Sequence, residues 1–247
     1  MKRLFSIKKK TVLLLIICLL LVAAVYLCSV YLLDFYKADT EAVESFKSAS
    51  EIKEYELKRG VIAFEPAEAE SALIFYPGGK VEYTSYIPLM RACAERGILC
   101  ILVKMPFNLA VFDINAADGL CENYPEIDSW YIGGHSLGGA MSASYLDKNI
   151  ENFDGLVLLG AYSTSDFSDE KIKVLSVYGS LDGVMNREKY EENRENLPKD
   201  YEEHIIDGGC HAYFGMYGEQ DGDGTPTISN VEQIYITAEK IDEFVAK

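Results

Sequence analysis

The sequence predicts an α/β fold in which about eight strands form a mostly parallel sheet with helices on both faces, preceded by one transmembrane helix. Three observations lead to this prediction. Short apolar runs that end in glycine or proline alternate with longer helical segments, which is typical of sheets built from β-α-β units. A run without charge occupies residues 11–33. A Gly-x-Ser-x-Gly motif at Gly134–Gly138 lies between a predicted strand and a predicted helix.

Residues 11–33 predict a membrane anchor, because they carry no charge and a helix of this length reaches roughly 35 Å, enough to cross the hydrocarbon core. The alternative is a cleaved signal peptide, whose apolar region is usually shorter and ends in small residues. Val25–Ser29 reads Val-Tyr-Leu-Cys-Ser, so we expect an uncleaved signal anchor. The basic residues within 1–10 place that end in the cytoplasm and the rest of this single-pass chain outside the cell membrane.

The chain has a formal net charge of −16, with 23 Lys and Arg against 39 Asp and Glu. Five basic residues and no acidic ones precede residue 34, so the remainder is more acidic still. This excludes nucleic acid as a partner, since phosphate binding needs clustered Lys and Arg. With 49% hydrophobic residues, the chain is expected to fold rather than remain disordered.

The first elements after the anchor differ from the later ones. Residues 34–49, mixed in charge, predict a helical stalk, and residues 50–247 predict one domain with its own core. Strands are predicted at 51–58 and 61–64. Because no helix lies between these two strands, we expect them to form an antiparallel edge.

Apolar runs stopped by turn residues predict the buried strands. The run 72–76 ends at Pro77-Gly78-Gly79, and a helix over 83–96 ends at Gly97, which suits a C-cap. The same alternation, with a loop over 104–113, predicts strands at 98–103, 130–132, 155–159, 173–178 and 201–207 and helices at 114–124, 139–148, 187–196 and 231–246. Ligands bind beyond the carboxyl ends of parallel strands, so functional residues are expected in the loops that follow strands.

The Gly-x-Ser-x-Gly motif predicts a nucleophile at Ser136. A serine at a sharp turn from strand to helix has a strained backbone, and Gly134 and Gly138 leave room for it. The positive end of the following helix and the Leu137 N–H would face an oxyanion. The alternative is a glycine-rich packing turn with an ordinary serine.

A serine nucleophile needs a general base, and we expect His211 to supply it. The chain has three histidines. His135 is adjacent to Ser136 and is expected to pack beside the turn, whereas His204 lies within a predicted strand. His211 follows the end of that strand, where it could reach Ser136. The alternative is a loop histidine held by local hydrogen bonds.

Asp182 is predicted to orient His211. It follows the predicted strand 173–178, and His211 follows the next predicted strand, 201–207. Asp207 and Asp221 are alternative acids, and a solvated turn is the alternative role for Asp182.

A second oxyanion donor is expected in the loop after residues 72–76. Gly79 is the first choice, since a glycine N–H can approach a ligand closely, and Lys80 is the second. The alternative is a plain Pro-Gly turn.

The chain order Ser136, Asp182, His211, together with the glycine loop, resembles the α/β-hydrolase superfamily over residues 50–247. Three stretches are similar to a compact bacterial subgroup of dienelactone-hydrolase size that often carries an N-terminal membrane segment: Ile74–Lys80, Lys104–Ala110 and His211–Gly215. Two departures stand out. Pro77-Gly78 replaces the His-Gly of the family's oxyanion loop, and a serine stands where dienelactone hydrolases use cysteine.

The resemblance implies a minimal cap or none, since only residues 160–171 separate the predicted strands at 155–159 and 173–178. An open cleft is therefore expected. Four side chains could form an apolar acyl pocket beside it: Phe107, Leu109, Tyr213 and Phe214. The alternative for each is ordinary core packing.

No cofactor or metal site is predicted. Gln220–Gly224 hints at calcium but supplies too few oxygen ligands, so we interpret it as a turn. Four cysteines after the anchor could form disulfides outside the cytoplasm or remain buried thiols, the interpretation we favour: Cys93, Cys100, Cys121 and Cys210.

The combined hypothesis is a membrane-anchored serine hydrolase of the carboxylesterase type, acting on a small-molecule or lipid-like ester, with thioesters and lactones as alternatives. Two other functions stay open: a hydrolase-fold binding or scaffold protein without turnover, and an acyltransferase. Fold alone does not choose among substrates, and the sequence does not set the oligomeric state.

Overall fold

The computed structural model describes residues 9–46 and 51–247 and divides into two compact units, with the boundary in the sequence between Phe35 and Tyr36. The first unit contains helix α1 (Lys9–Leu33). Its residues Lys10–Leu33 are long and apolar enough to cross a membrane, a test that a signal sequence near the N-terminus also meets. Most of the basic segment predicted at 1–10 lies outside the described residues.

The second unit is built on one eight-stranded sheet with the order β1-β2-β4-β3-β5-β6-β7-β8. The strands are β1 (Lys53–Lys58), β2 (Val61–Glu65), β3 (Ser71–Tyr76), β4 (Ile98–Val103), β5 (Ser129–His135), β6 (Gly155–Leu159), β7 (Lys173–Gly179) and β8 (Glu202–Ile206). The pairs β1–β2 and β2–β4 are antiparallel, and all other pairs are parallel. This confirms the mostly parallel sheet and its antiparallel edge.

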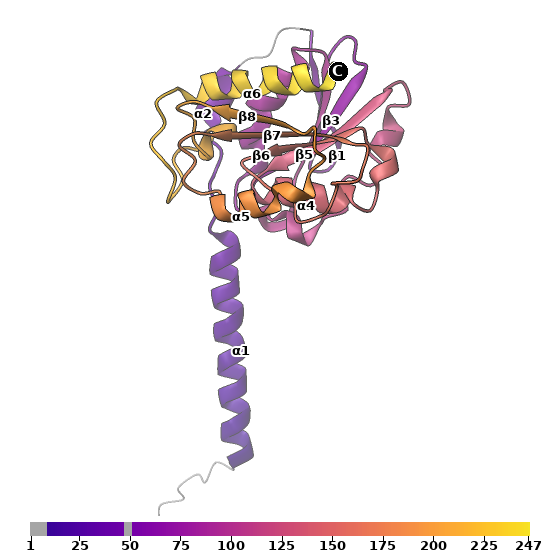
Figure 1. Ribbon diagram of the computed structural model, residues 1–247. Helices are drawn as coiled ribbons and strands as arrows, with labels where there is room; N and C mark the ends of the chain where they lie inside the picture. The colour runs from indigo at the N-terminus through magenta and orange to yellow at the C-terminus, as the bar shows by residue number, and fades with distance from the viewer. Residues whose placement is uncertain (1–8, 47–50) are drawn as a thin grey trace, which may run out of the picture. The chain divides into compact units, whose positions relative to one another are not determined.

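Helices cover both faces of the sheet, with α6 on one face and α4 and α5 on the other (Figure 1). The α-helices of this unit are α2 (Thr40–Ser45), α3 (Ile87–Ala94), α4 (Leu137–Leu146), α5 (Arg187–Asn193) and α6 (Asn230–Val245). Short 3₁₀ helices are η1 (Tyr83–Tyr86), η2 (Pro106–Asn108), η3 (Ala110–Phe112), η4 (Cys121–Asn123), η5 (Ile150–Asn152), η6 (Arg194–Asn196) and η7 (Ala212–Phe214).

The central strands are apolar throughout because both of their faces are buried. In β3, Leu73 and Phe75 pack in the core with α3 and α6, whereas Ile74 and Tyr76 pack in the core that includes α4. Each fully buried leucine, isoleucine or phenylalanine contributes about 1.5–3 kcal/mol relative to exposure. This two-sided core fixes the carboxyl ends of the strands, and with them the loops that follow.

The stalk predicted for residues 34–49 is helical only over Thr40–Ser45 in the described residues. Asp39 begins this helix by accepting a hydrogen bond from the Ala42 N–H at 3.0 Å. Val43 and Phe46 are buried in the core, so the segment is part of the folded unit. The apolar face of this segment explains why, because a free helical stalk would expose Val43 and Phe46 to water and lose the free energy gained by burying them.

The helix predicted over 114–124 is wrong. This segment makes successive turns and ends in η4, with a left-handed backbone at Gly119 (φ +71°). The buried Tyr76 hydroxyl donates to the Ile114 carbonyl at 2.8 Å and accepts from the Ala117 N–H at 3.0 Å. Those backbone groups therefore bond to a side chain from β3 and do not enter a helical ladder.

The helix predicted over 83–96 is divided into η1 and α3. The division falls just before Pro88, which lies in the first turn of α3. Proline has no N–H and is tolerated in a first turn, where that N–H would have no partner.

Candidate active site

Four neighbouring parallel strands end at the same edge of the sheet. Ser136 follows β5, Gly160 follows β6, Asp182 lies just beyond β7, and His211 lies beyond β8. The topology therefore gathers residues that are far apart in the sequence into adjacent loops.

Ser136 occupies a strained turn between β5 and α4, with φ +52° and ψ −121°. Its N–H donates to the Leu159 carbonyl at 2.9 Å, which holds the turn against β6. A Cβ atom added to Gly134 or Gly138 would collide with the Tyr76 carbonyl oxygen. The predicted need for glycine on both sides of Ser136 thus has its steric cause in β3.

Asp182 and His211 form a buried pair. His211 Nδ1 lies 2.8 Å from Asp182 Oδ2, and the two side chains are 1% and 0% exposed. Asp182 Oδ1 accepts the N–H groups of Val184 and Met185 at 2.9 and 2.8 Å, which fix the carboxylate. Because a carboxylate only accepts, His211 Nδ1 carries the proton and Nε2 has the free lone pair.

His211 Nε2 is buried and has no hydrogen-bond partner among the described residues, and no hydrogen bond to Ser136 Oγ is present. The surroundings of Gly160 and His135 indicate that Ser136 and His211 lie near each other. Gly160 lines the same cavity as Ser136, and a Cβ atom there would lie 2.9 Å from His211 Nδ1. The His135 ring, next to Ser136 in the chain, lies 4.4 Å from the His211 ring between centroids.

Among the described residues, neither alternative acid forms a hydrogen bond with the His211 side chain. Asp207 is exposed and accepts from the Ser180 hydroxyl at 3.3 Å, and Asp221 is exposed.

Hydrogen bonds in the loop after β3 distinguish the two candidate oxyanion donors. The Lys80 N–H donates to the Asn108 carbonyl at 2.7 Å, and the Gly78 N–H donates to the Tyr86 hydroxyl at 3.1 Å. The Gly79 N–H has no acceptor among the described residues. A Cβ atom on Gly79 would lie 2.8 Å from Leu137 Cδ2, so this glycine approaches the start of α4, where backbone N–H groups lack helical partners.

The loop after β4 is strained where it meets the Gly79 loop. Phe107 and Asn108 have left-handed backbones with φ +53° and +54°, and Lys80 has φ +59°. Each such residue costs roughly 1–2 kcal/mol when it is not glycine. The Lys80–Asn108 hydrogen bond joins the two loops at this point, and such strain often occurs at functional sites.

His135 lies behind this loop in a fully buried network. Its Nδ1 lies 2.8 Å from the Tyr86 hydroxyl, which also accepts the Gly78 N–H. Tyr86 therefore donates its own proton to His135 Nδ1. Burial lowers the pKa of His135 well below its usual value, and the nearby His211 lowers it further, so His135 is neutral at pH 7. The sequence indicated a packed His135 but not its contact with His211 and Tyr86.

A cavity of about 300 Å³ opens beside Ser136. Its lining carries no charged side chain and comprises Ser136, Leu137, Ala140, Gly160, Ala161, Tyr162, Val184, Met185 and Asn186. Ala161 after β6 and Ala140 in α4 have side chains small enough to leave this cavity open. Another wall is formed by the residues that follow Asp182, namely Val184, Met185 and Asn186.

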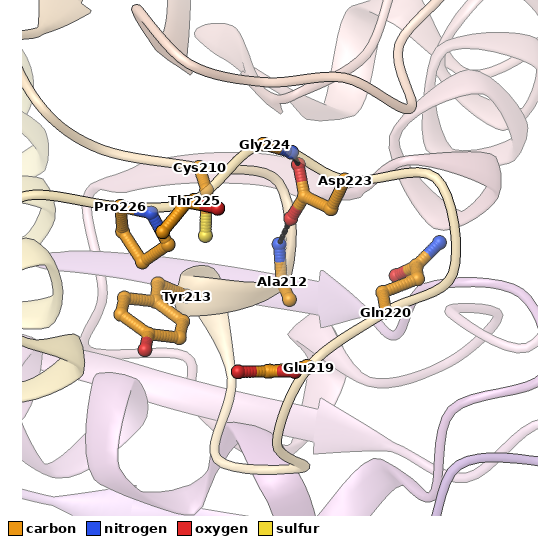
Figure 2. A pocket seen from close by; sticks show the side chains of 9 residues that line it. All are labelled: Cys210, Ala212, Tyr213, Glu219, Gln220, Asp223, Gly224, Thr225 and Pro226. Atoms are coloured by element: carbon orange, nitrogen blue, oxygen red, sulfur yellow. Dashed lines mark hydrogen bonds between the residues drawn. The ribbon is translucent and has the colours of Figure 1, made fainter.

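The four predicted pocket residues do not line this cavity. Phe214 is fully buried in the core and Leu109 packs near Gly79, whereas Phe107 is 57% exposed. Tyr213 lines a different cavity, with Cys210 and Asp223 (Figure 2). The sequence identified apolar residues near the site but did not indicate which way the loops turn.

Two further features of the sequence are its cysteines and the segment Gln220–Gly224. All six cysteines are unpaired thiols, and burial raises the pKa of Cys210 to about 12. No cluster of three His, Cys, Asp or Glu side chains that could hold a metal occurs within residues 9–46 and 51–247. In Gln220–Gly224, the Asp223 N–H donates to the Gln220 carbonyl at 3.1 Å, as in a turn.

The parallel sheet and the strained serine turn define an α/β hydrolase. A model of the alpha/beta hydrolase family matches residues 72–235, and the chain belongs to this family. A search of curated proteins finds no match.

Solved structures share this fold at low identity. A dienelactone hydrolase from Anabaena variabilis is 14% identical, with a TM-score of 0.57, over 79% of this chain and 98% of that one. Est1E from Butyrivibrio proteoclasticus is 15% identical, with a TM-score of 0.56, over 80% and 100%. A hormone-sensitive lipase from a metagenome library is 18% identical, with a TM-score of 0.59, over 83% and 87%.

Proposed function

We propose that this chain is a serine hydrolase that cleaves carboxylic esters through a Ser136-His211-Asp182 triad. The observation that carries the proposal is the buried hydrogen bond of 2.8 Å between His211 and Asp182, at the same edge of the sheet as a serine with φ +52°. A buried carboxylate that fixes one nitrogen of a histidine leaves the other nitrogen as a base. The similar solved structures include a dienelactone hydrolase and a hormone-sensitive lipase, which supports ester chemistry.

In this mechanism, Ser136 Oγ attacks the ester carbonyl while His211 Nε2 takes its proton. Asp182 keeps the proton on His211 Nδ1 and stabilises the imidazolium. The N–H groups of Leu137 and Gly79 hold the oxyanion. His211 then protonates the leaving alcohol and activates the water that releases the acyl group.

The cavity beside Ser136 supports a neutral substrate. Its walls are mostly apolar and carry no charge, so an apolar acyl or alcohol group would fit it. The net charge of −16 also disfavours anionic substrates, an effect that salt screens.

Helix α1 supports a membrane-anchored form with the second unit outside the cytoplasm. It contains a span, Lys10–Leu33, that is long and apolar enough to cross a membrane, and basic residues precede it in the sequence. The positive-inside rule sets the proposed orientation.

The direct test is labelling with a fluorophosphonate, which reacts with activated serines. Wild-type chain should be labelled and Ser136→Ala should not. Ser144→Ala is the matched control, because Ser144 lies on α4 and donates to the Ala140 carbonyl at 3.0 Å, away from the proposed reaction. Lack of labelling in folded wild type would favour a binding protein without turnover.

A further inference from the structure

Asp223 joins the loops that carry Asp182 and His211. Its Oδ1 accepts the N–H groups of Gly183 and His211, both at 3.1 Å, and its Oδ2 accepts the Ala212 N–H at 2.8 Å. Oδ1 also accepts the Gly224 N–H at 2.9 Å, and Figure 2 shows this bond and the one to Ala212. One half-buried carboxylate thus bonds to the residue after Asp182, to His211 itself and to the residue after His211.

These contacts are independent of the bond between Asp182 and His211. That bond joins two side chains, whereas the four bonds described above join Asp223 to backbone N–H groups. Each of the two loops leaves a different strand, β7 or β8, and Asp223 bonds to both just beyond those strands. A shift of either loop would stretch bonds to the same carboxylate.

We propose that Asp223 is a positioning residue that fixes the distance between Asp182 and His211. The proposal rests on the proposed function for its effect on catalysis. Asp223 touches neither substrate nor the reacting atoms, and it acts through the backbone of the two loops.

The contacts require a carboxylate. Four N–H groups point at two oxygens, and all four are donors. An asparagine could keep the three bonds at one oxygen, but its amide nitrogen would then face the Ala212 N–H, donor against donor. These N–H groups lower the pKa of Asp223 despite its partial burial, which fits a carboxylate that stays charged.

The test compares Asp223→Asn with Asp221→Asn in the full-length chain in detergent micelles. Asp221 lies in the same turn and is exposed. We expect Asp223→Asn to lower kcat on the order of 100-fold with little change in KM, as a misplacement near 1 Å does. The low-field proton resonance of His211 Nδ1–H should weaken or exchange faster. Asp221→Asn should match wild type in both measurements.

An Asp223→Asn protein with wild-type kcat and an unchanged His211 resonance would overturn the proposal. A loss of activity with that resonance intact would also overturn it, because the pair would then be undisturbed. The resonance does not depend on turnover, so it tests Asp223 even if no ester is cleaved and the proposed function fails.

If Asp223→Asn does not fold, hydrogen exchange in the wild-type chain replaces it. The amides of Gly183, His211 and Ala212 should be protected and should open together, since one carboxylate holds all three. Free exchange at Gly183 while His211 and Ala212 stay protected would show that the loops are not joined, and would refute the proposal.

Discussion

A single methyl group added at Gly160 should lower kcat in addition to the free energy of unfolding. Its φ is +53°, and an added Cβ would lie 2.9 Å from His211 Nδ1 and 3.2 Å from Asp182 Oδ2. Real Cβ atoms essentially never approach as closely as the first distance, so His211 must move in Gly160→Ala. A residue other than glycine with this backbone also costs roughly 1–2 kcal/mol.

Gly218→Ala is the matched control, because Gly218 has φ +83° and nothing lies within 4 Å of the position that an added Cβ would take. Both variants should lose about 1–2 kcal/mol of unfolding free energy from the backbone term, measured by urea denaturation. Only Gly160→Ala should also lose kcat, on the order of 100-fold, in hydrolysis of a nitrophenyl ester. Equal kcat values in the two variants would show that the contact with His211 does not matter for the reaction.

Two further predictions concern pH and topology. Unfolding free energy should fall as pH drops below about 6.5, because His135 stays neutral when folded but gains a proton when unfolded, at up to about 1.4 kcal/mol per pH unit. His135→Asn should flatten this slope more than His204→Asn, since His204 is less buried; an unchanged slope in His135→Asn contradicts the assignment. Protease added to intact cells should digest the unit that begins at Tyr36, and protection of that unit would contradict the proposed orientation.

Most of the sheet could be predicted from the sequence, because strands buried on both faces appear as continuous apolar runs such as Ile98–Val103. The turn at Ser136 could be predicted because the glycines that its packing against β3 requires form a recognisable motif around the serine. The helix at 114–124 could not be judged correctly, since the hydroxyl that disrupts it belongs to Tyr76, a distant residue. Local pattern contains no signal for such a partner.

The parts of the candidate site that depend on the order of the strands could be predicted from the sequence. The parts that depend on the conformation of the loops could not. The loops of Asp182 and His211 meet because β7 and β8 are neighbours. The cavity lined by Val184 and Met185 depends on the turn after Asp182, and Asp223 was seen only as part of a turn. A carboxylate among glycines in the loop after the last strand was the one available sign of its role.

The order of these residues along the chain has a consequence for biosynthesis. Ser136 emerges from the ribosome long before His211, and Asp223 emerges later still. The backbone bonds that Asp223 makes to both loops can form only after that last residue has emerged. Under the proposed mechanism, a growing chain would therefore carry an inert serine, and activity would begin only once the C-terminal part has been made and folded.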